Sequence, residues 1–308
     1  MDGVVVFDRR AAELGRAGEG LERLASGAAW SEGPVWMHED GSVLWSDIPN
    51  NRMLRWHPED GQSVWRDQVE YTNGHFRERD GSLLHCSHGR RAIIRTRFNG
   101  DLSQGVDEVL VDRFQGRRLN SPNDVIVKSD GSIWFTDPPY GIASDHEGHL
   151  APSELRDNYV FRLDPASGAL DIVSDAVEEP NGLAFSPDES VLYVSDTSAA
   201  MRHDGSGHHH IMAFDVIDGR TLASPRVFAV VEPGLSDGFR IDTRGWLYTS
   251  SADSVQVYHP DGTRLAAIPV PEKVGNLTFG GRERDELFIC ASTSLYRIRL
   301  HACGIQTP

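Results

Sequence analysis

The amino-acid sequence predicts an all-β protein, a six-bladed β-propeller with four antiparallel strands in each blade. The main observation is a repeat: a turn followed by a short apolar strand that ends in small or polar residues recurs six times along the 308 residues. The second is the spacing of 40 to 58 residues between successive turns, which is the length of one propeller blade. The six copies are DGSVLWSD (40–47), DGSLLHCS (80–87), DGSIWFTD (130–137), DESVLYVSD (188–196), TRGWLYTSS (243–251) and RDELFICAS (284–292).

Each copy has apolar segments on both sides that complete a blade. One apolar strand precedes the turn, as in GPVWM or NGLAF, and another follows after a loop, as in RMLRW (52–56) or YVFRL (159–163). A fourth, weaker strand such as SVWR (63–66) ends the repeat. A pair of β-sandwiches is the alternative all-β architecture, but it does not explain why one hairpin returns six times in the same register.

The N-terminal segment lies outside the six repeats, and no linker interrupts the chain, so we expect one domain over residues 1–308. The strand VVVF (4–7) is expected to form the outermost strand of the last blade and to close the ring, because closure leaves no sheet edge exposed. Residues 8–26 are rich in Ala, Glu, Leu and Arg, which predicts a short helical segment before the first blade.

The net charge argues against two classes of partner. The chain has 30 Lys and Arg against 46 Asp and Glu, a formal charge of −16, so nucleic-acid phosphates and anionic membrane surfaces would repel it. No apolar run reaches the roughly 18 residues of a membrane span, and the first residues do not resemble a secretory signal. Cys86, Cys290 and Cys303 are too few for a disulfide framework, and we expect buried thiols in a reducing cytoplasm. A monomer and a homodimer both remain open.

Acids and primary amides begin the innermost strand of every repeat, about nine positions before the turn. Because the innermost strands of a propeller line its central channel, these six side chains are expected to surround one mouth of that channel. A ring of carboxylate and amide oxygens suits a hard divalent cation, chiefly Ca²⁺ or Mg²⁺. A lone Asn-Gly is more often a turn residue, but here the turns lie downstream. The ring consists of Glu32, Asn73, Asn123, Asn181, Asp237 and Asn276.

Around these residues the sequence resembles the family of gluconolactonases, senescence marker protein (regucalcin) and luciferin-regenerating enzymes, and within it the bacterial gluconolactonase branch. The resemblance covers nearly the whole chain from residue 20. The motifs that carry it occur in the same order and at similar spacing, and they are AAWSEGPVW (28–36), LNSPNDVIVKSDGSIWFTDPPYG (119–141), EPNGLAFSPDESVLYVSD (179–196) and GLSDGFRIDTRGWLYTS (234–250).

The resemblance implies one catalytic divalent cation in the channel of the propeller. The metal ligands that it implies are Glu32, Asn181 and Asp237, with Asn123 as a fourth ligand or as a contact to substrate or water. Ca²⁺ is the first expectation, and Mg²⁺, Mn²⁺ or Zn²⁺ are the alternatives. Ser121 stands where the animal branch carries a substrate-binding Arg, so the sugar contacts of that branch do not transfer to this sequence.

The activity implied by the resemblance is that of a metal-dependent lactonase, which hydrolyses a sugar lactone of the glucono-1,5-lactone type to the aldonic acid. The cation would polarise the carbonyl, and Asp237 would take a proton from the attacking water or attack the carbonyl directly. The alternatives are a phosphotriesterase of the fluorophosphatase type, because the same Lewis acid polarises P=O, and a calcium-binding propeller without catalysis.

Three further features are weaker indications. His88 in the second repeat and Tyr140 in the DPPYG motif are candidate sugar contacts, together with Asn73 and Asn123; ordinary packing of His88 and Tyr140 is the alternative. Asn276 could face substrate or solvent. The loop MRHDGSGHHH (201–210) contains four histidines and superficially resembles a transition-metal site. Its spacing is irregular, so we expect a surface loop or a lid over the channel mouth.

Overall fold

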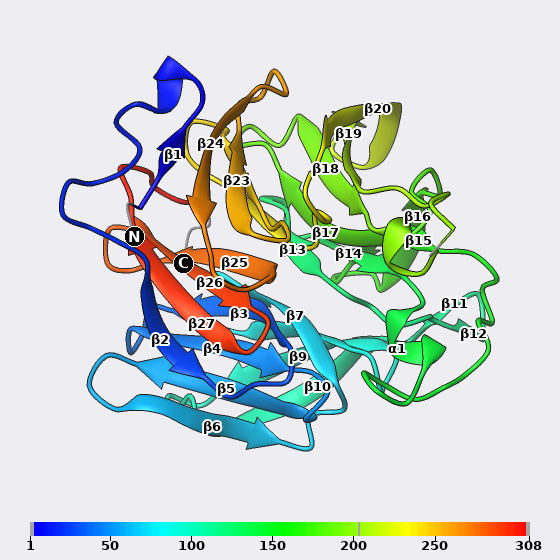
Figure 1. Ribbon diagram of the computed structural model, residues 1–308. Helices are drawn as coiled ribbons and strands as arrows, with labels where there is room; N and C mark the ends of the chain where they lie inside the picture. Colours follow the sequence, from blue (N-terminus) through cyan, green and yellow to red (C-terminus); the bar gives the residue numbers. More distant parts are fainter. Residues whose placement is uncertain (1–2, 203, 306–308) are drawn as a thin grey trace.

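The computed structural model describes residues 3–202 and 204–305, and it confirms the predicted six-bladed β-propeller. Six antiparallel sheets follow one another along the chain and are arranged around a common axis (Figure 1). In the described part of the chain, no helix is long and apolar enough to cross a membrane.

In the first four blades the strands follow one another in sequence order across the sheet. The first three blades are β3 (Ser31–Met37), β4 (Ser42–Asp47), β5 (Arg52–His57) and β6 (Gly61–Asp67); β7 (Thr72–Arg77), β8 (Leu83–Ser87), β9 (Ala92–Phe98) and β10 (Gly105–Val111); and β13 (Val125–Val127), β14 (Ile133–Asp137), β15 (Tyr159–Asp164) and β16 (Ala169–Ser174). The fourth blade consists of β17 (Pro180–Phe185), β18 (Val191–Asp196), β19 (His210–Ile217) and β20 (Thr221–Val230). The fifth blade contains β21 (Phe239–Ile241), β22 (Leu247–Thr249), β23 (Ser254–Tyr258) and β24 (Arg264–Pro269). The sixth blade contains β25 (Val274–Gly280), β26 (Glu286–Ala291) and β27 (Ser294–Arg299).

Two N-terminal strands join the last two blades, and here two predictions were wrong. The segment VVVF does not close the ring: β1 (Val5–Val6) adds a fifth strand to the fifth blade beside β24, as Figure 1 shows. The ring is closed by β2 (Glu22–Ser26), which pairs with β27 as the outermost strand of the sixth blade. No helical segment spans 8–26, where the structure has only the single 3₁₀ turn η1 (Arg9–Ala11) before β2. Pairing with β27 therefore outweighs the local helix propensity.

The repeated turn shares one backbone feature in all six copies. One residue in each copy has a positive φ, the left-handed region in which glycine carries no Cβ penalty. Four copies place glycine there, whereas the fourth and sixth copies force a residue with a side chain into this region. The six residues and their φ values are Gly41 (72°), Gly81 (87°), Gly131 (84°), Glu189 (57°), Gly245 (82°) and Arg284 (56°).

Apolar side chains fill the spaces between neighbouring blades. In the described part of the chain they form six clusters, one at each interface between blades. Between the sixth and first blades, Phe288 packs with Trp45 and Trp56. Between the third and fourth blades, the rings of Trp134 and Phe185 meet edge to face with their centroids 5.2 Å apart. Because each blade is apolar on both faces, the polar side chains are left to the channel and the outer surface.

Hydroxyl groups tie each of three blades to the channel strand of the next blade. Ser46 at the end of β4 donates to the carbonyl of Asn73 (2.9 Å), and Thr136 on β14 donates to the carbonyl of Asn181 (2.7 Å). Ser195 on β18 donates in the same way to the carbonyl of Asp237 (2.9 Å). The small polar residues that end the repeated strand therefore hold the backbone of the predicted ring.

A carboxylate at the end of the second strand anchors the chain that enters the same blade. Asp47 accepts a hydrogen bond from the backbone N–H of Ala29 (2.8 Å) and pairs with Arg52 (2.8 Å). Asp137 accepts from the backbone N–H of Asn120 (2.8 Å), but its second oxygen, Oδ1, is buried and has no hydrogen-bond partner among the described residues. Burial therefore raises the pKa of Asp137 to about 7.

The segments outside the blades are short. The hairpin of β11 (Arg113–Phe114) and β12 (Arg117–Arg118) precedes the third blade, and α1 (Tyr140–Ala143) follows β14. The 3₁₀ turn η2 (Ser198–Ala200) follows β18 and begins the loop that returns to β19.

Candidate functional site

All six residues of the predicted ring lie where the innermost strands begin. Glu32, Asn73, Asn181 and Asn276 are on β3, β7, β17 and β25, and Asn123 and Asp237 lie two residues before β13 and β21. Five of these residues are buried, and Asp237 is half-buried. Six polar side chains at the starts of the innermost strands, five of them buried, indicate a binding site, because buried polar groups are costly unless they have partners.

Close packing of the channel strands brings these residues together. A Cβ atom at Gly238 would lie 2.0 Å from Cγ of Asn276, and a Cβ at Gly275 would lie 2.7 Å from Oε1 of Glu32. The backbone N–H of Gly238 donates to the carbonyl of Gly275 (2.9 Å), which joins the fifth blade directly to the sixth. Glycine is needed at these positions because a side chain would occupy the space of the ring residues.

Two carboxylates, Glu32 and Asp237, form the charged part of the site. Burial and the nearby charge of Asp237 raise the pKa of Glu32 well above its usual value. Oε2 of Glu32 accepts hydrogen bonds from the Asn276 side chain (2.9 Å) and the Gly33 backbone (2.6 Å). Oε1 of Glu32 is buried and has no partner among the described residues. Asn276 therefore faces Glu32 rather than solvent, and one Glu32 oxygen is left for a ligand.

Asp237 has charged and polar neighbours from three other segments of the chain. Burial raises the pKa of this carboxyl, while the positive charge of Lys273 and a hydrogen bond from the Asn181 side chain oppose the rise. The negative charge of Glu147, from the loop after α1, raises it further. Lys273 lies exposed above the ring of Trp30, with its Nζ 5.3 Å from the ring centroid. Lys273 and Glu147 thus add charge near Asp237 that the ring motif alone does not reveal.

Tyr140 reaches the site through a chain of hydrogen bonds. Its hydroxyl is bonded to the hydroxyl of Thr197, which also accepts from Nδ2 of Asn181 (3.2 Å). Nearby, burial raises the pKa of Glu179 to about 7, and a hydrogen bond with Tyr140 opposes this rise. Oε2 of Glu179 is a further buried oxygen without a partner among the described residues. Tyr140 therefore supports Asn181, which ordinary turn packing would not require.

His88 holds the amide of Asn73 in one orientation. Nδ1 of His88 lies 2.9 Å from the carbonyl oxygen of Glu147, which can only accept, so Nδ1 carries the proton. Nε2 therefore accepts from Nδ2 of Asn73 (3.3 Å), and burial lowers the pKa of His88 to about 4. This arrangement leaves Oδ1 of Asn73 buried and without a partner among the described residues.

A buried ion pair also adjoins the ring. Arg240 on β21 donates to Oδ2 of Asp124 (3.3 Å), and both side chains are almost fully buried. Asn276 also hydrogen-bonds to Asp124, which links this pair to the ring. The pair was not singled out in the sequence, although Asp124 directly follows the ring residue Asn123.

The segment GLSDG (234–238) matches the G-x-S-x-G pattern of hydrolase nucleophiles but is not one. Ser236 is completely buried, and its hydroxyl is bonded to the hydroxyl of Thr249 (2.7 Å) rather than to a histidine. The segment leads into a β-strand, whereas a nucleophile elbow leads into a helix.

The histidine-rich loop differs from its expectation in one respect. His208 and His210 lie beside the carboxylate of Asp196, which comes from the neighbouring strand β18. His209 instead bonds through Nδ1 to the carbonyl of Val231 (2.9 Å), and His203 lies outside the described residues.

The donor set at the ring fits a divalent cation. It combines two carboxylates with amide groups, and oxygen atoms of Glu32 and Asn73 are buried without partners among the described residues. Two neighbouring carboxylates are both ionised at low cost only when a positive charge lies between them. The sulfur-free set favours a hard cation over a soft one.

Comparison with known proteins shows which family this chain is similar to. Residues 30–293 match the family described as SMP-30/Gluconolactonase/LRE-like region. The gluconolactonase of Zymomonas mobilis is 34% identical over 92% of this chain and 82% of its own length. Pentonolactonase XacC of Haloferax volcanii is 30% identical over 84% of this chain and 80% of its length. The solved structure of a gluconolactonase from Xanthomonas campestris superposes with a TM-score of 0.87 at 41% identity, covering 97% of this chain and 95% of that one.

Substitution of Gly238 tests the close packing between the channel strands of the fifth and sixth blades. We expect Gly238→Ala to destabilise the protein by about 1–3 kcal/mol, because its Cβ would collide with Asn276. Activity should fall as well, since Asn276 would leave Glu32. In the double variant Gly238→Ala/Asn276→Ala the colliding atoms are absent. Its loss of unfolding free energy, measured with urea, should therefore be smaller than the sum of the losses in the two single variants. Additive effects would contradict the assigned contact.

Proposed function

This chain belongs to the SMP-30/gluconolactonase/LRE-like family and is a lactone-hydrolysing enzyme, and we propose that Glu32, Asn123, Asn181 and Asp237 hold its divalent cation. The main support for this proposal is the environment of the Glu32 carboxyl group. It is buried against a second carboxylate, and one of its oxygens has no partner among the described residues. Ca²⁺ is the cation we propose, because all the donors are oxygens and two of them are anionic.

When bound, the cation supplies a Lewis acid that polarises the lactone carbonyl and stabilises the negative charge developing on its oxygen. Asp237 takes the proton from the attacking water at one of its carboxylate oxygens. The water oxygen forms the new bond to the carbonyl carbon, the ring C–O bond breaks, and the ring oxygen becomes a hydroxyl by taking up a proton. The acid product ionises, so each turnover releases one proton at neutral pH.

The other residues hold the reacting groups in place. Lys273 favours the ionised form of Asp237, and Asn181 donates a hydrogen bond to that carboxylate. Oδ1 of Asn73 accepts a hydrogen bond from a sugar hydroxyl, because His88 has fixed the amide so that this oxygen is free. His88 thus acts through Asn73 rather than as a base, since its Nε2 lone pair is already engaged. Tyr140 contributes through Thr197 to the position of Asn181.

The proposed substrate is an aldonolactone, with D-glucono-1,5-lactone as the representative. It is a neutral cyclic ester, which suits a site whose own groups already include two carboxylates. A direct attack by Asp237 on the carbonyl is the alternative to general-base catalysis. A single turnover in ¹⁸O-labelled water separates them, because only direct attack places oxygen from Asp237 in the product and label in the protein.

Removal of the metal tests the proposal as a whole. We expect dialysis against a chelator to reduce lactone hydrolysis at least about a hundredfold, and Ca²⁺ to restore it. The measurement is a pH-indicator assay over a panel of lactones, with a phosphotriester as the competing substrate class. Faster turnover of the phosphotriester would favour the fluorophosphatase alternative. A chain inactive towards both substrates with and without Ca²⁺ would favour a calcium-binding propeller without catalysis.

We also propose a cytoplasmic location and a small-molecule partner only. Cys86 and Cys290 are buried and Cys303 is half-buried, and all three are free thiols, as expected in a reducing compartment. The charge of −16 disfavours nucleic acids and anionic membranes. Whether the chain is a monomer or a homodimer is decided by its mass in solution.

A further inference from the structure

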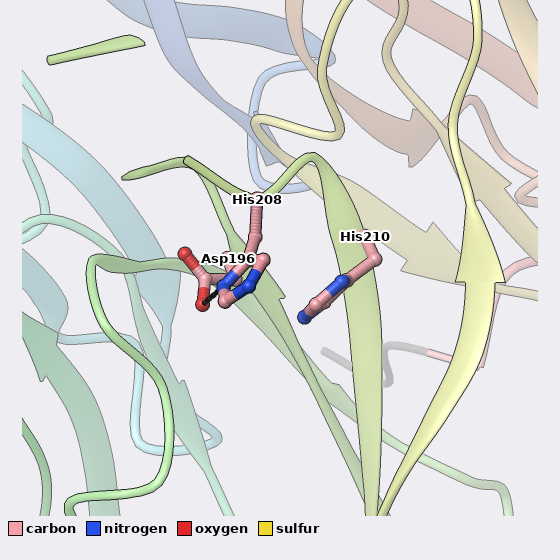
Figure 2. Close-up of side chains that lie close together, drawn as sticks. All are labelled: Asp196, His208 and His210. Atoms are coloured by element: carbon pink, nitrogen blue, oxygen red, sulfur yellow. Dashed lines mark hydrogen bonds and ion pairs between the residues drawn. The ribbon is translucent and has the colours of Figure 1, made fainter. Parts of the chain in front are cut away.

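Two imidazoles and a carboxylate converge where the histidine-rich loop joins the fourth blade. Asp196 ends β18, and His210, the first residue of β19, is its partner in the strand register. His208 lies two residues earlier, in the loop. Figure 2 shows the three side chains turned toward one another, and one ligand atom from each lies within 4.8 Å of the others.

Backbone contacts hold this arrangement in place without a ligand. The carbonyl of His208 accepts from the backbone N–H of Ala199 (3.0 Å), and the N–H of His208 donates to the hydroxyl of Ser198 (2.8 Å). A Cβ atom at Gly207 would lie 2.3 Å from the nitrogen of Ala199, so glycine allows this close approach. The loop therefore returns to η2 in a defined path, although its sequence spacing is irregular.

Asp196 is fixed by the entering chain in the same way as Asp47 and Asp137. Its oxygens accept from the backbone N–H groups of Ser198 (3.0 Å) and Glu178 (3.1 Å). Where Arg52 lies beside Asp47, the imidazole of His208 lies beside Asp196. The carboxylate thus presents an oriented oxygen to the histidines.

The separation of two of the three donors suits a small transition-metal ion. Nδ1 of His208 lies 3.2 Å from Oδ2 of Asp196, close to the separation of about 3.3 Å between neighbouring donors in a tetrahedral zinc site with bonds of about 2.0 Å. The rings of His208 and His210 are stacked with centroids 4.6 Å apart. Oε2 of Glu178 lies 3.7 Å from Nδ1 of His208 and pairs with Arg202 (2.8 Å) at the rim of the cluster.

We propose that Asp196, His208 and His210 form a second metal site, which binds a divalent transition-metal ion such as Zn²⁺ and is separate from the channel site. Imidazole nitrogen favours Zn²⁺ over Ca²⁺, whereas the oxygen-lined channel has the opposite preference. The site would tie the loop to β18. Thr197, which supports both Tyr140 and Asn181, directly follows Asp196. This proposal does not depend on the lactonase activity.

Calorimetric titration with Zn²⁺ tests this site in the untagged, metal-stripped full chain, with Ca²⁺ in excess to occupy the channel. We expect one Zn²⁺ per chain with a micromolar or tighter dissociation constant. His208→Ala and His210→Ala should each weaken binding by at least about tenfold. His209→Ala is the matched control, because its Nδ1 is bonded to the carbonyl of Val231, and it should bind Zn²⁺ as the parent does.

A second readout is independent of enthalpy. Zn²⁺ should raise the melting temperature of the parent and of His209→Ala, but not of His210→Ala, because a ligand bound only to the folded state stabilises it. Melting without Zn²⁺ shows whether each variant folds. The proposal is wrong if the parent binds no Zn²⁺ under these conditions, or if His209→Ala loses as much affinity as the other two. It is also wrong if Glu32→Gln abolishes the Zn²⁺ isotherm, because the ion would then be in the channel.

Discussion

Replacement of Glu32 by Gln, Asn181 by Ala or Asp237 by Asn is expected to abolish lactone hydrolysis and leave the propeller folded. Each variant removes one proposed ligand from a different blade, and the lost transition-state stabilisation of about 4 kcal/mol corresponds to about a thousandfold in rate. The fold should tolerate the change at Glu32 especially well. Burial and the charge of Asp237 raise the pKa of Glu32, so its charged form is costly in the metal-free protein, and the neutral Gln side chain removes that cost.

The measurement is kcat/KM at saturating Ca²⁺, together with the melting temperature with and without Ca²⁺. In the parent, Ca²⁺ should raise the melting temperature, and this rise should be lost in Glu32→Gln. The exposed Glu59→Gln is a matched control and should behave as the parent in both measurements. Near-parental turnover in any two of the three variants would overturn the channel assignment.

The second large effect concerns stability and pH. Because burial raises the pKa of Asp137 to about 7, the folded state holds a proton that the unfolded state releases near pH 4. This group therefore stabilises the fold below pH 4, and its contribution is lost as the pH rises through 7. The full displacement from 3.8 to about 7 corresponds to about 4 kcal/mol of unfolding free energy.

Asparagine has no charge to bury, so Asp137→Asn should be more stable than the parent at pH 8 and nearly equal to it at pH 4. Urea unfolding at one-unit steps between these values measures the difference in slope. The exposed Asp175→Asn should keep the slope of the parent. Parallel pH profiles for the parent and Asp137→Asn would show that the carboxyl is ionised in the folded state.

The fold was predictable because the pattern that marks each blade lies within a short stretch of sequence. The turn, the apolar strand after it and the polar residue before it lie within some fifteen residues, so six copies can be aligned without knowledge of contacts. The identity of the closing strand was not predictable in this way. VVVF and ERLAS are both short segments able to pair with a sheet edge, and only the path of the chain around the ring decides which edge each one meets.

The candidate site was likewise predictable only in the part that belongs to the repeat. The ring residues share one register, so their convergence could be inferred from the repeat alone. Lys273 and Glu147 come from connecting loops, whose positions no periodicity describes. His208 and His210 were judged by their spacing along the chain, whereas their neighbour Asp196 comes from the adjacent strand. Cross-strand register is needed to find such a cluster.

The closing of the ring by β2 has a consequence for biosynthesis. β2 leaves the ribosome early, but its partner β27 is among the last segments made, and the ion pair of Glu22 with Arg297 spans 275 residues. Blades one to five can assemble in order of synthesis, while β2 has no sheet to join until residues 294–299 emerge. Asn276 and Glu32, on the sixth and first blades, meet only at that stage. A nascent chain interrupted before β27 would therefore carry an exposed strand and an incomplete site, which makes late translation the stage most exposed to aggregation and proteolysis.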